Sequence, residues 1–347
     1  MIKQPIKRGE CPKCGMDIID PGNFCYRCKK FVDKDMKRIL EPGEVSDEIL
    51  DAFMDRTWKL KEEYAKNGAD KVFNSAKKQI IIGIIMIISL ILSIPGIILF
   101  VIGVMKILTY KDSPVECLSD EDLEEVVTGY LVPEILEEFF DEVEEYRHDK
   151  VFPAALIHES SLMQTVYNKV EGSDYVSGTY KGISACFSDV ELIYTYSKTV
   201  DIESRKSVFK GMFLCCDLGI TLPECVTVWE REGHEDMGKG LATGNSAFDE
   251  QFYVESRHPE TAGRIMTPKL LECIRNLDDT GDGRTTLKFM EDGKLYVAIE
   301  SKHDLFEIRT QDERVGELRR RFKQELFRIL DLMEVIGEIK EKVFFLQ

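Results

Sequence analysis

The chain has few histidines and no excess of positive charge, and both shortages limit its possible functions. Only five of its 347 residues are histidine, and none has another at ligand spacing, so the sequence does not indicate an imidazole-based metal or catalytic site. The formal net charge is −17, which argues against nucleic-acid binding by the whole molecule because phosphates repel such a surface. Hydrophobic residues make up 44% of the chain, so it also lacks the composition of a disordered protein.

A disulfide framework and a cleavable signal peptide are not indicated either. The first residues are polar and basic, so we expect no signal peptide. Six cysteines after residue 30 have no paired spacing, and free cysteines in apolar runs are typical of buried positions in a reducing compartment. These six are Cys117, Cys186, Cys215, Cys216, Cys225 and Cys273.

The remaining four cysteines form a strong metal-binding pattern. Two Cys-x-x-Cys pairs are separated by ten residues, and structural zinc takes four thiolate ligands in a tetrahedron. Two disulfides or a redox pair are less favoured, because a redox pair normally lies beside a large sheet. We therefore expect one structural Zn²⁺, which supplies the folding energy of residues 1–32. Its predicted ligands are Cys11, Cys14, Cys25 and Cys28.

The same residues resemble the zinc-ribbon family, with its Cys-Pro-x-Cys-Gly and Phe-Cys-x-x-Cys motifs. Members of that family usually have a glycine after the last cysteine, and this chain has Lys29 there. The glycine after the first cysteine pair is present as Gly15. The resemblance implies that the ribbon, residues 1–32, is an interaction module.

A long apolar run predicts membrane insertion. Ile80–Met105 is 26 residues without a charge, and 20 of them are Ile, Leu, Val, Met or Phe. Pro95-Gly96 interrupts the run, so residues 79–108 form either one kinked span or a helical hairpin. Lysines precede and follow the apolar run, which fits either a hairpin with both ends in the cytoplasm or a single span with only a weak preference for one orientation. We expect the protein to be located in the cell membrane, with the ribbon and the C-terminal domain on the cytoplasmic side.

Two helical segments flank this run. Residues 33–78 are an expected linker with an amphipathic helix from Ser46 to Tyr64. Residues 109–149 are an expected acidic neck, which opens with a capping box at Ser119 and breaks at Pro133.

From about residue 150 the pattern predicts a mixed α+β domain, residues 150–347, with a mainly antiparallel sheet and a long C-terminal helix. The expected helices begin at Thr267-Pro268 and cover Gln311–Ile339. The expected strands lie in Tyr175–Tyr196, Val208–Cys216, Val226–Trp229 and Phe248–Val254, with a hairpin of Thr286–Met290 and Lys294–Ile299.

Several motifs of this domain resemble the domain-of-unknown-function 3137 family, over about residues 115–340. That family's name implies no activity, substrate or catalytic residue. The motifs are Asp174-Tyr-Val-Ser-Gly178, Ser188-Asp189, Val208-Phe-Lys-Gly211, Phe248–Val254 with Ala262 and Met266-Thr-Pro268, and Leu295–Ile299.

Two further motifs are rejected. Gly233–Gly240 is close to a phosphate-binding loop, but Gly240 stands where that loop needs Ser or Thr. Asp278–Gly283 is similar to a calcium loop, but its twelfth position is Phe289 and not Glu.

We expect a non-enzymatic, membrane-anchored adaptor or scaffold whose partners are the lipid bilayer and a protein bound through the ribbon or the acidic domain. One alternative is a membrane-tethered enzyme with a site in residues 150–340, built from carboxylates such as Asp189, Asp217 and Glu255. The other is nucleic-acid binding through the ribbon, since residues 1–40 hold ten basic and five acidic residues. Nucleic acid is the least favoured partner.

Overall fold

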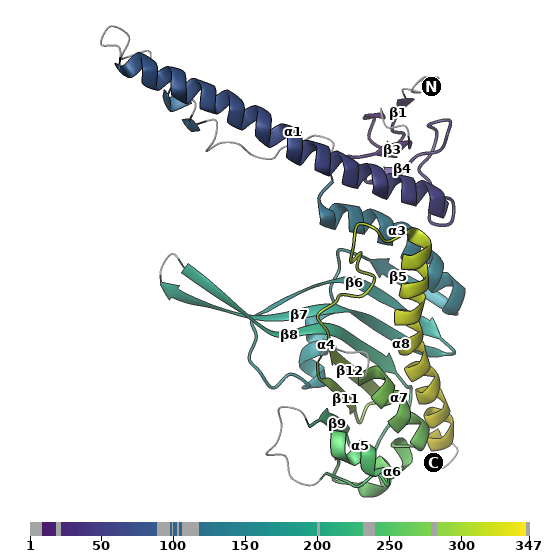
Figure 1. The fold of residues 1–347 in the computed structure, drawn as a ribbon. Coiled ribbons are helices and arrows are strands. Elements are labelled where there is room, and N and C mark those ends of the chain that lie inside the picture. The colour runs from purple at the N-terminus through teal and green to yellow at the C-terminus, as the bar shows by residue number, and fades with distance from the viewer. Residues whose placement is uncertain are drawn as a thin grey trace. The chain divides into compact units, whose positions relative to one another are not determined.

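The computed structural model describes residues 9–18, 22–88, 98, 100–102, 104–105, 118–199, 202–231, 240–278 and 283–344. The chain divides into two compact units (Figure 1). The first contains residues up to 40 and 45–123, and the second contains 41–44 and the residues from 124 onward. Each is described by itself.

The first unit consists of two short hairpins and one long helix. Strands β1 (Gly9–Glu10) and β2 (Asp17–Ile18) form one hairpin, and β3 (Phe24–Cys25) and β4 (Lys30–Phe31) form the other. Helix α1 runs from Asp47 to Ile88.

The start of α1 completes the apolar core of the second hairpin. The ring of Phe53 lies 4.5 Å from that of Phe24 and 5.2 Å from that of Phe31, and all three side chains are at most 1% exposed. Aromatic side chains bury a large area for their number, so three of them give this small hairpin a core that the ribbon alone lacks.

No helix in the described part of the chain is both long enough and apolar enough to cross a membrane. Within the expected membrane segment, residues 89–97, 99, 103 and 106–108 lie outside the described residues. The span or hairpin therefore stays a prediction from the sequence.

The second unit is built on an eight-stranded sheet in which all neighbouring strands are antiparallel. Its spatial order is β10-β9-β11-β12-β8-β7-β6-β5 (Figure 1). The mixed α+β class with a large antiparallel sheet is confirmed. The strands are β5 (Glu142–Arg147), β6 (Lys169–Tyr180), β7 (Ile183–Thr199), β8 (Ile202–Asp217), β9 (Val226–Glu230), β10 (Phe252–Glu255), β11 (Thr285–Phe289) and β12 (Lys294–Glu300).

Helices cover both faces of this sheet. On one face Ile157 of α4 packs in a core cluster with Phe213 of β8 and Tyr296 of β12. Successive residues of a strand point to opposite faces, so Met212 points away from the face on which Phe213 lies. Met212 and Ile299 line a cavity together with residues of α8, and α8 therefore covers the opposite face of the sheet. The helices of this unit are α3 (Asp120–Phe139), α4 (Ala154–Ser160), α5 (Ser246–Gln251), α6 (Pro259–Ile265), α7 (Pro268–Asp278) and α8 (Val315–Phe344).

The expected break at Pro133 is wrong, because α3 continues through it to Phe139. Proline inside a helix costs about 3 kcal/mol. Val132, Ile135 and Leu136 are all 0% exposed, and burial of their side chains offsets that cost. The capping box is present: Asp122 N donates to Ser119 Oγ at 2.9 Å, and Ser119 N donates to Asp122 Oδ2 at 3.2 Å.

The expected strand Phe248–Val254 is wrong in its first half. Asn245 caps a short helix, α5, by accepting a hydrogen bond from Phe248 N at 3.2 Å, and strand β10 begins only at Phe252. The aromatic residues that suggested a strand are buried in both elements, with Phe248 0% and Phe252 1% exposed. Periodicity alone does not separate a buried helical turn from a buried strand in so short a segment.

Candidate functional site

The four predicted metal ligands come together in the ribbon. The sulfur atoms of Cys11, Cys14, Cys25 and Cys28 all lie within 4.8 Å of one another. The Cys11 and Cys28 sulfurs are 3.8 Å apart, and those of Cys14 and Cys25 are 3.6 Å apart. A cluster of this size and chemistry could hold one metal ion.

Backbone turns after each cysteine pair produce this convergence. Gly15 has φ +70° and donates its N–H to the carbonyl of Cys11 at 2.8 Å, which folds the first pair back on itself. Lys29 has φ +52°, so the residue that replaces the ribbon family's glycine keeps a left-handed backbone. A side chain in that conformation costs about 1–2 kcal/mol.

The four thiols differ in their surroundings. Cys11 and Cys25 are 2% exposed and pack with Ile18 and Val32, whereas Cys14 and Cys28 are half-buried. A hydrogen bond from the backbone of Met16 is the main cause that lowers the pKa of Cys14 to about 7, and burial raises the pKa of Cys28 to about 12. Metal binding requires all four as thiolates, so affinity falls as the solution becomes more acidic.

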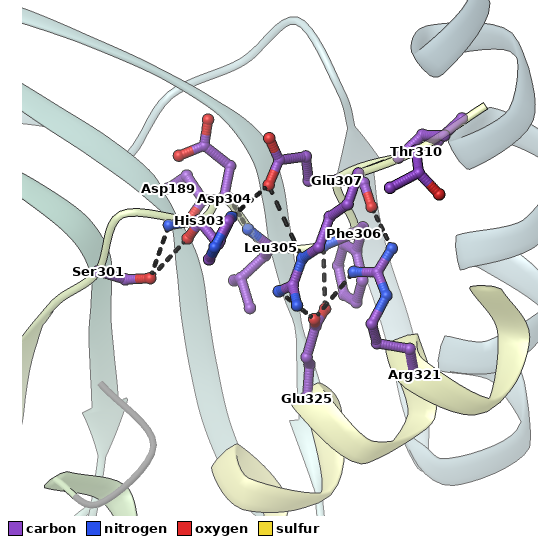
Figure 2. Close-up of polar contacts among 12 residues, drawn as sticks. Asp189, Ser301, His303, Asp304, Leu305, Phe306, Glu307, Thr310, Arg321 and Glu325 are labelled. Carbon is purple, nitrogen blue, oxygen red and sulfur yellow. Dashed lines mark hydrogen bonds and ion pairs between the residues drawn. The ribbon is translucent and has the colours of Figure 1, made fainter. Parts of the chain in front are cut away.

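A second polar cluster holds the connector between β12 and α8, residues 301–314. Carboxylates from three different elements accept hydrogen bonds from its backbone N–H groups. Figure 2 shows two of these acids, Asp189 and Glu325, beside the connector. Asp189 of β7 accepts from Leu305 at 2.5 Å, Glu325 of α8 from Phe306 at 3.2 Å, and Glu124 of α3 from Ile308 at 2.7 Å. These acids therefore supply the hydrogen-bond acceptors for three backbone N–H groups of the connector.

A buried acid–histidine pair lies next to Asp189. Asp174, which is 3% exposed, accepts a hydrogen bond from the Tyr146 hydroxyl at 2.7 Å, and its Oδ1 lies 3.1 Å from His148 Nδ1. Asp174 follows Ser173, which pairs with Asp189 across β6 and β7. Burial raises the pKa of Asp189 well above its usual value and that of Glu124 to about 7.

A cavity of about 350 Å³ adjoins this cluster, between the sheet and α8. Its walls carry both signs of charge, including Asp189, Asp304 and Arg328. Two of its arginines are already paired, because Arg309 and Arg321 each contact Glu325 at 3.1 Å.

The carboxylates proposed for an enzyme do not converge. Asp189 holds the connector, Asp217 accepts from Gly219 N at 2.8 Å in a turn, and Glu255 accepts from Trp229 Nε1 at 3.4 Å. Within the described residues no hydrogen bond or ion pair joins any two of them. Residues 232–239 and 279–282, which carry most of the two rejected loop motifs, lie outside the described residues.

Sequence reasoning missed the Asp174–His148 pair. The two residues are 26 positions apart, with His148 just after the end of β5 and Asp174 in β6, so spacing along the chain could not reveal their contact. Only the presence of Asp174 in one of the family motifs pointed to this region.

Residues 207–339 match the family described as "Protein of unknown function (DUF3137)". The match confirms the resemblance over residues 207–339, from β8 into α8, and the motifs at Asp174–Gly178 and Ser188-Asp189 lie before it. The description names no activity and therefore assigns no catalytic residue.

No curated protein matches the chain. Among solved structures, the chain is similar to the crystal structure of the mycobacterial trehalose monomycolate transport factor A, TtfA, at 15% identity and a TM-score of 0.30. The likeness covers 58% of this chain and 90% of that chain. At that TM-score it supports no argument about function.

Proposed function

We propose that the protein is a membrane-anchored, non-enzymatic adaptor whose ribbon binds one structural zinc ion and contacts a protein partner. The observation that carries the proposal is the four-cysteine cluster. Zn–S bonds of about 2.3 Å place tetrahedral sulfurs about 3.8 Å apart. The sulfur separations of 3.8 and 3.6 Å fit that value. Four protein thiolates leave no open coordination position, so the metal is structural.

Membrane attachment is supported by the apolar run and by the exposure of its side chains. On α1, Ile81, Ile82 and Ile84 are 44–48% exposed, and beyond it Ile98 and Val101 are at least 50% exposed. Large apolar side chains that gather at exposed positions typically mark a membrane or partner surface. We propose that both the ribbon and the sheet unit lie on the cytoplasmic side, where free cysteines persist.

The non-enzymatic part of the proposal rests on how the acids of the second unit are used. Asp189, Glu325 and Glu124 are bound to backbone N–H groups, which is a structural use of a buried carboxylate. A membrane-tethered enzyme is the alternative, with the cavity beside Asp189 as its site.

Nucleic acid is disfavoured because Phe24 and Phe31 of the ribbon are 1% exposed and cannot stack on bases.

Metal analysis of the detergent-purified chain tests the zinc site. We expect one zinc per chain, lost on the double substitution Cys11→Ser/Cys28→Ser and retained in Cys273→Ser, whose thiol lies in α7 of the other unit. Zinc-free wild-type protein purified without chelator would contradict the proposal.

Fractionation and capture test the adaptor role. We expect both the wild-type chain and the Cys11→Ser/Cys28→Ser variant in the membrane fraction. A protein partner should be crosslinked to the wild-type chain and should not be captured with the variant. Identical partner sets for both forms would exclude the ribbon as the binding surface.

Labelling of Cys225 tests the sidedness. Its side chain is half-exposed, whereas Cys215 is 8% exposed and therefore a poor target. An impermeant thiol reagent should modify Cys225 only after the cells are permeabilised, and modification in intact cells would place the sheet unit outside.

A further inference from the structure

Two cysteines that are far apart in sequence lie opposite each other in the sheet. Cys186 of β7 and Cys215 of β8 are direct partners in the antiparallel register. Direct partners have Cα atoms about 4.5–5.5 Å apart and side chains on the same face. A disulfide needs a Cα separation of about 4.4–6.8 Å, so the two could be bridged without backbone movement. Both are free thiols in the structure.

The pair is asymmetric in exposure. Cys215 is 8% exposed and lies in the core cluster with Phe213 and Tyr296, whereas Cys186 is half-buried at the edge of that cluster. One thiol is therefore accessible to a small reagent, and the other is held beside it and shielded. Accessible cysteines next to a second cysteine are typical of reversible redox sites.

The pair is also asymmetric in acidity. The neighbouring Cys215 thiol is the largest cause that lowers the pKa of Cys186, and Tyr175 and Lys150 also lower it. The pKa of Cys215 is raised, first by its interaction with Cys186 and then by burial. The accessible Cys186 therefore loses its proton more readily than the shielded Cys215 and is the better nucleophile of the two.

We propose that Cys186 and Cys215 form a redox modification site in which a small hydroperoxide oxidises Cys186 and Cys215 then closes a cross-strand disulfide. In the first step the Cys186 sulfur attacks one peroxide oxygen, the O–O bond breaks, and the other oxygen leaves as water or an alcohol after taking a proton. Cys186 becomes a sulfenic acid. In the second step the Cys215 sulfur attacks the sulfenic sulfur, the S–S bond forms, and hydroxide leaves and takes the Cys215 proton to become water.

Neighbouring cysteines do not share this geometry. Cys216 follows Cys215 on β8 and pairs with Ala185, so its side chain points to the opposite face. Cys225 precedes β9, and Cys273 lies in α7. In a reducing compartment a disulfide of this kind is transient, as expected of a redox-responsive site and not of a structural crosslink.

Peptide mapping of the full-length, detergent-purified chain tests the proposal. The protein is treated with hydrogen peroxide, its remaining thiols are alkylated, and it is digested with trypsin. Cleavage after Lys181, Lys198, Lys210 and Arg231 yields peptides 182–198, with Cys186, and 211–231, with Cys215, Cys216 and Cys225. We expect these two peptides joined by a disulfide that a reductant reverses.

Matched substitutions identify the partner thiol within peptide 211–231. Cys215→Ser should reduce the linked product at least about tenfold and leave Cys186 as sulfenic or higher acids, whereas Cys216→Ser and Cys225→Ser should leave the product within about twofold of wild type. Loss of the product in Cys216→Ser but not in Cys215→Ser would overturn the proposal.

A measurement on the unsubstituted wild-type chain tests the proposal independently of whether the variants fold. At neutral pH we expect iodoacetamide to alkylate Cys186 faster than the likewise half-exposed Cys225, because the neighbouring Cys215 thiol lowers the pKa of Cys186. Equal or slower alkylation of Cys186, or no linked peptide at any peroxide concentration, would rule the site out.

Discussion

The ribbon of the first unit and the sheet of the second bury their interiors by different means. One core cluster of the ribbon has four buried members, of which two are the cysteines Cys11 and Cys25, and the buried Phe24 and Phe31 pack with Phe53 of α1. The core of the sheet unit contains ten buried residues on one face alone, including Phe213 and Tyr296. A core as small as the ribbon's cannot offset the entropy of ordering its chain, so metal coordination has to supply most of its stability.

This difference predicts where single changes act. Removing the metal should unfold the ribbon and leave the sheet, whereas removing a core side chain should weaken the sheet and leave the metal bound.

Zinc removal has the largest expected effect. Structural zinc contributes about 10–16 kcal/mol of apparent binding free energy at neutral pH, so chelation or Cys25→Ser should unfold residues 9–32. Hydrogen exchange should show full loss of protection there and unchanged protection in β7, β8 and β12. Protection retained in the ribbon after complete zinc loss would show that its apolar contacts are sufficient.

Truncation of Phe213 comes next. This residue is 0% exposed, and its ring lies 5.0 Å from Phe152. Phe213→Ala should lower the free energy of unfolding of the sheet unit by about 3–5 kcal/mol without changing the zinc content. Denaturant titration measures this change. Phe327→Ala is the control, because Phe327 is 50% exposed and the same truncation should cost about 1 kcal/mol or less.

The third test uses pH and Glu124. Burial raises its pKa to about 7, with Asp174 and Glu307 adding to the shift and the N–H of Ile308 and His148 opposing it. Between about pH 5 and pH 7 the folded state holds a proton that the unfolded state has released, so this group makes the free energy of unfolding fall as pH rises.

Glu124→Gln keeps an oxygen acceptor for Ile308 N but cannot ionise. We expect the variant to be more stable than wild type above pH 7 by about 2 kcal/mol and to lose this part of the pH dependence. Unfolding at pH 5 and pH 8 measures it. Glu137→Gln, at an exposed position of the same helix, should behave as wild type.

The smallest effect is expected at Gly15. Its φ is +70°, and a Cβ there would meet nothing within 4 Å, so Gly15→Ala introduces backbone strain without a clash. Strain of about 1 kcal/mol should raise the zinc dissociation constant about fivefold. Competition with a chromophoric chelator measures it, and Glu10→Ala, exposed in β1, should leave the constant unchanged.

Local patterns predicted the elements that depend on local chemistry. The hairpin of β11 and β12 and the start of α7 at Pro268 agree with turn and capping residues in the sequence. Two of the misjudged elements, at Pro133 and Phe248, are those where burial outweighed local preference. A third is Glu142–Arg147, which was expected in the helical neck and instead forms strand β5 beside β6. The long helix expected from Gln311 begins at Val315, where Glu317 Oε2 accepts a hydrogen bond from Arg314 N at 3.3 Å, just before the first turn.

By itself the sequence determined the identity of the four clustered cysteines and the α+β class of the second unit, because ligand spacing and side-chain period act over a few residues. Tertiary structure alone decided that Asp189 and Glu124 support one connector and that Cys186 faces Cys215. Such contacts depend on strand register, which is set by the packing of the whole sheet, and no short stretch of chain encodes it.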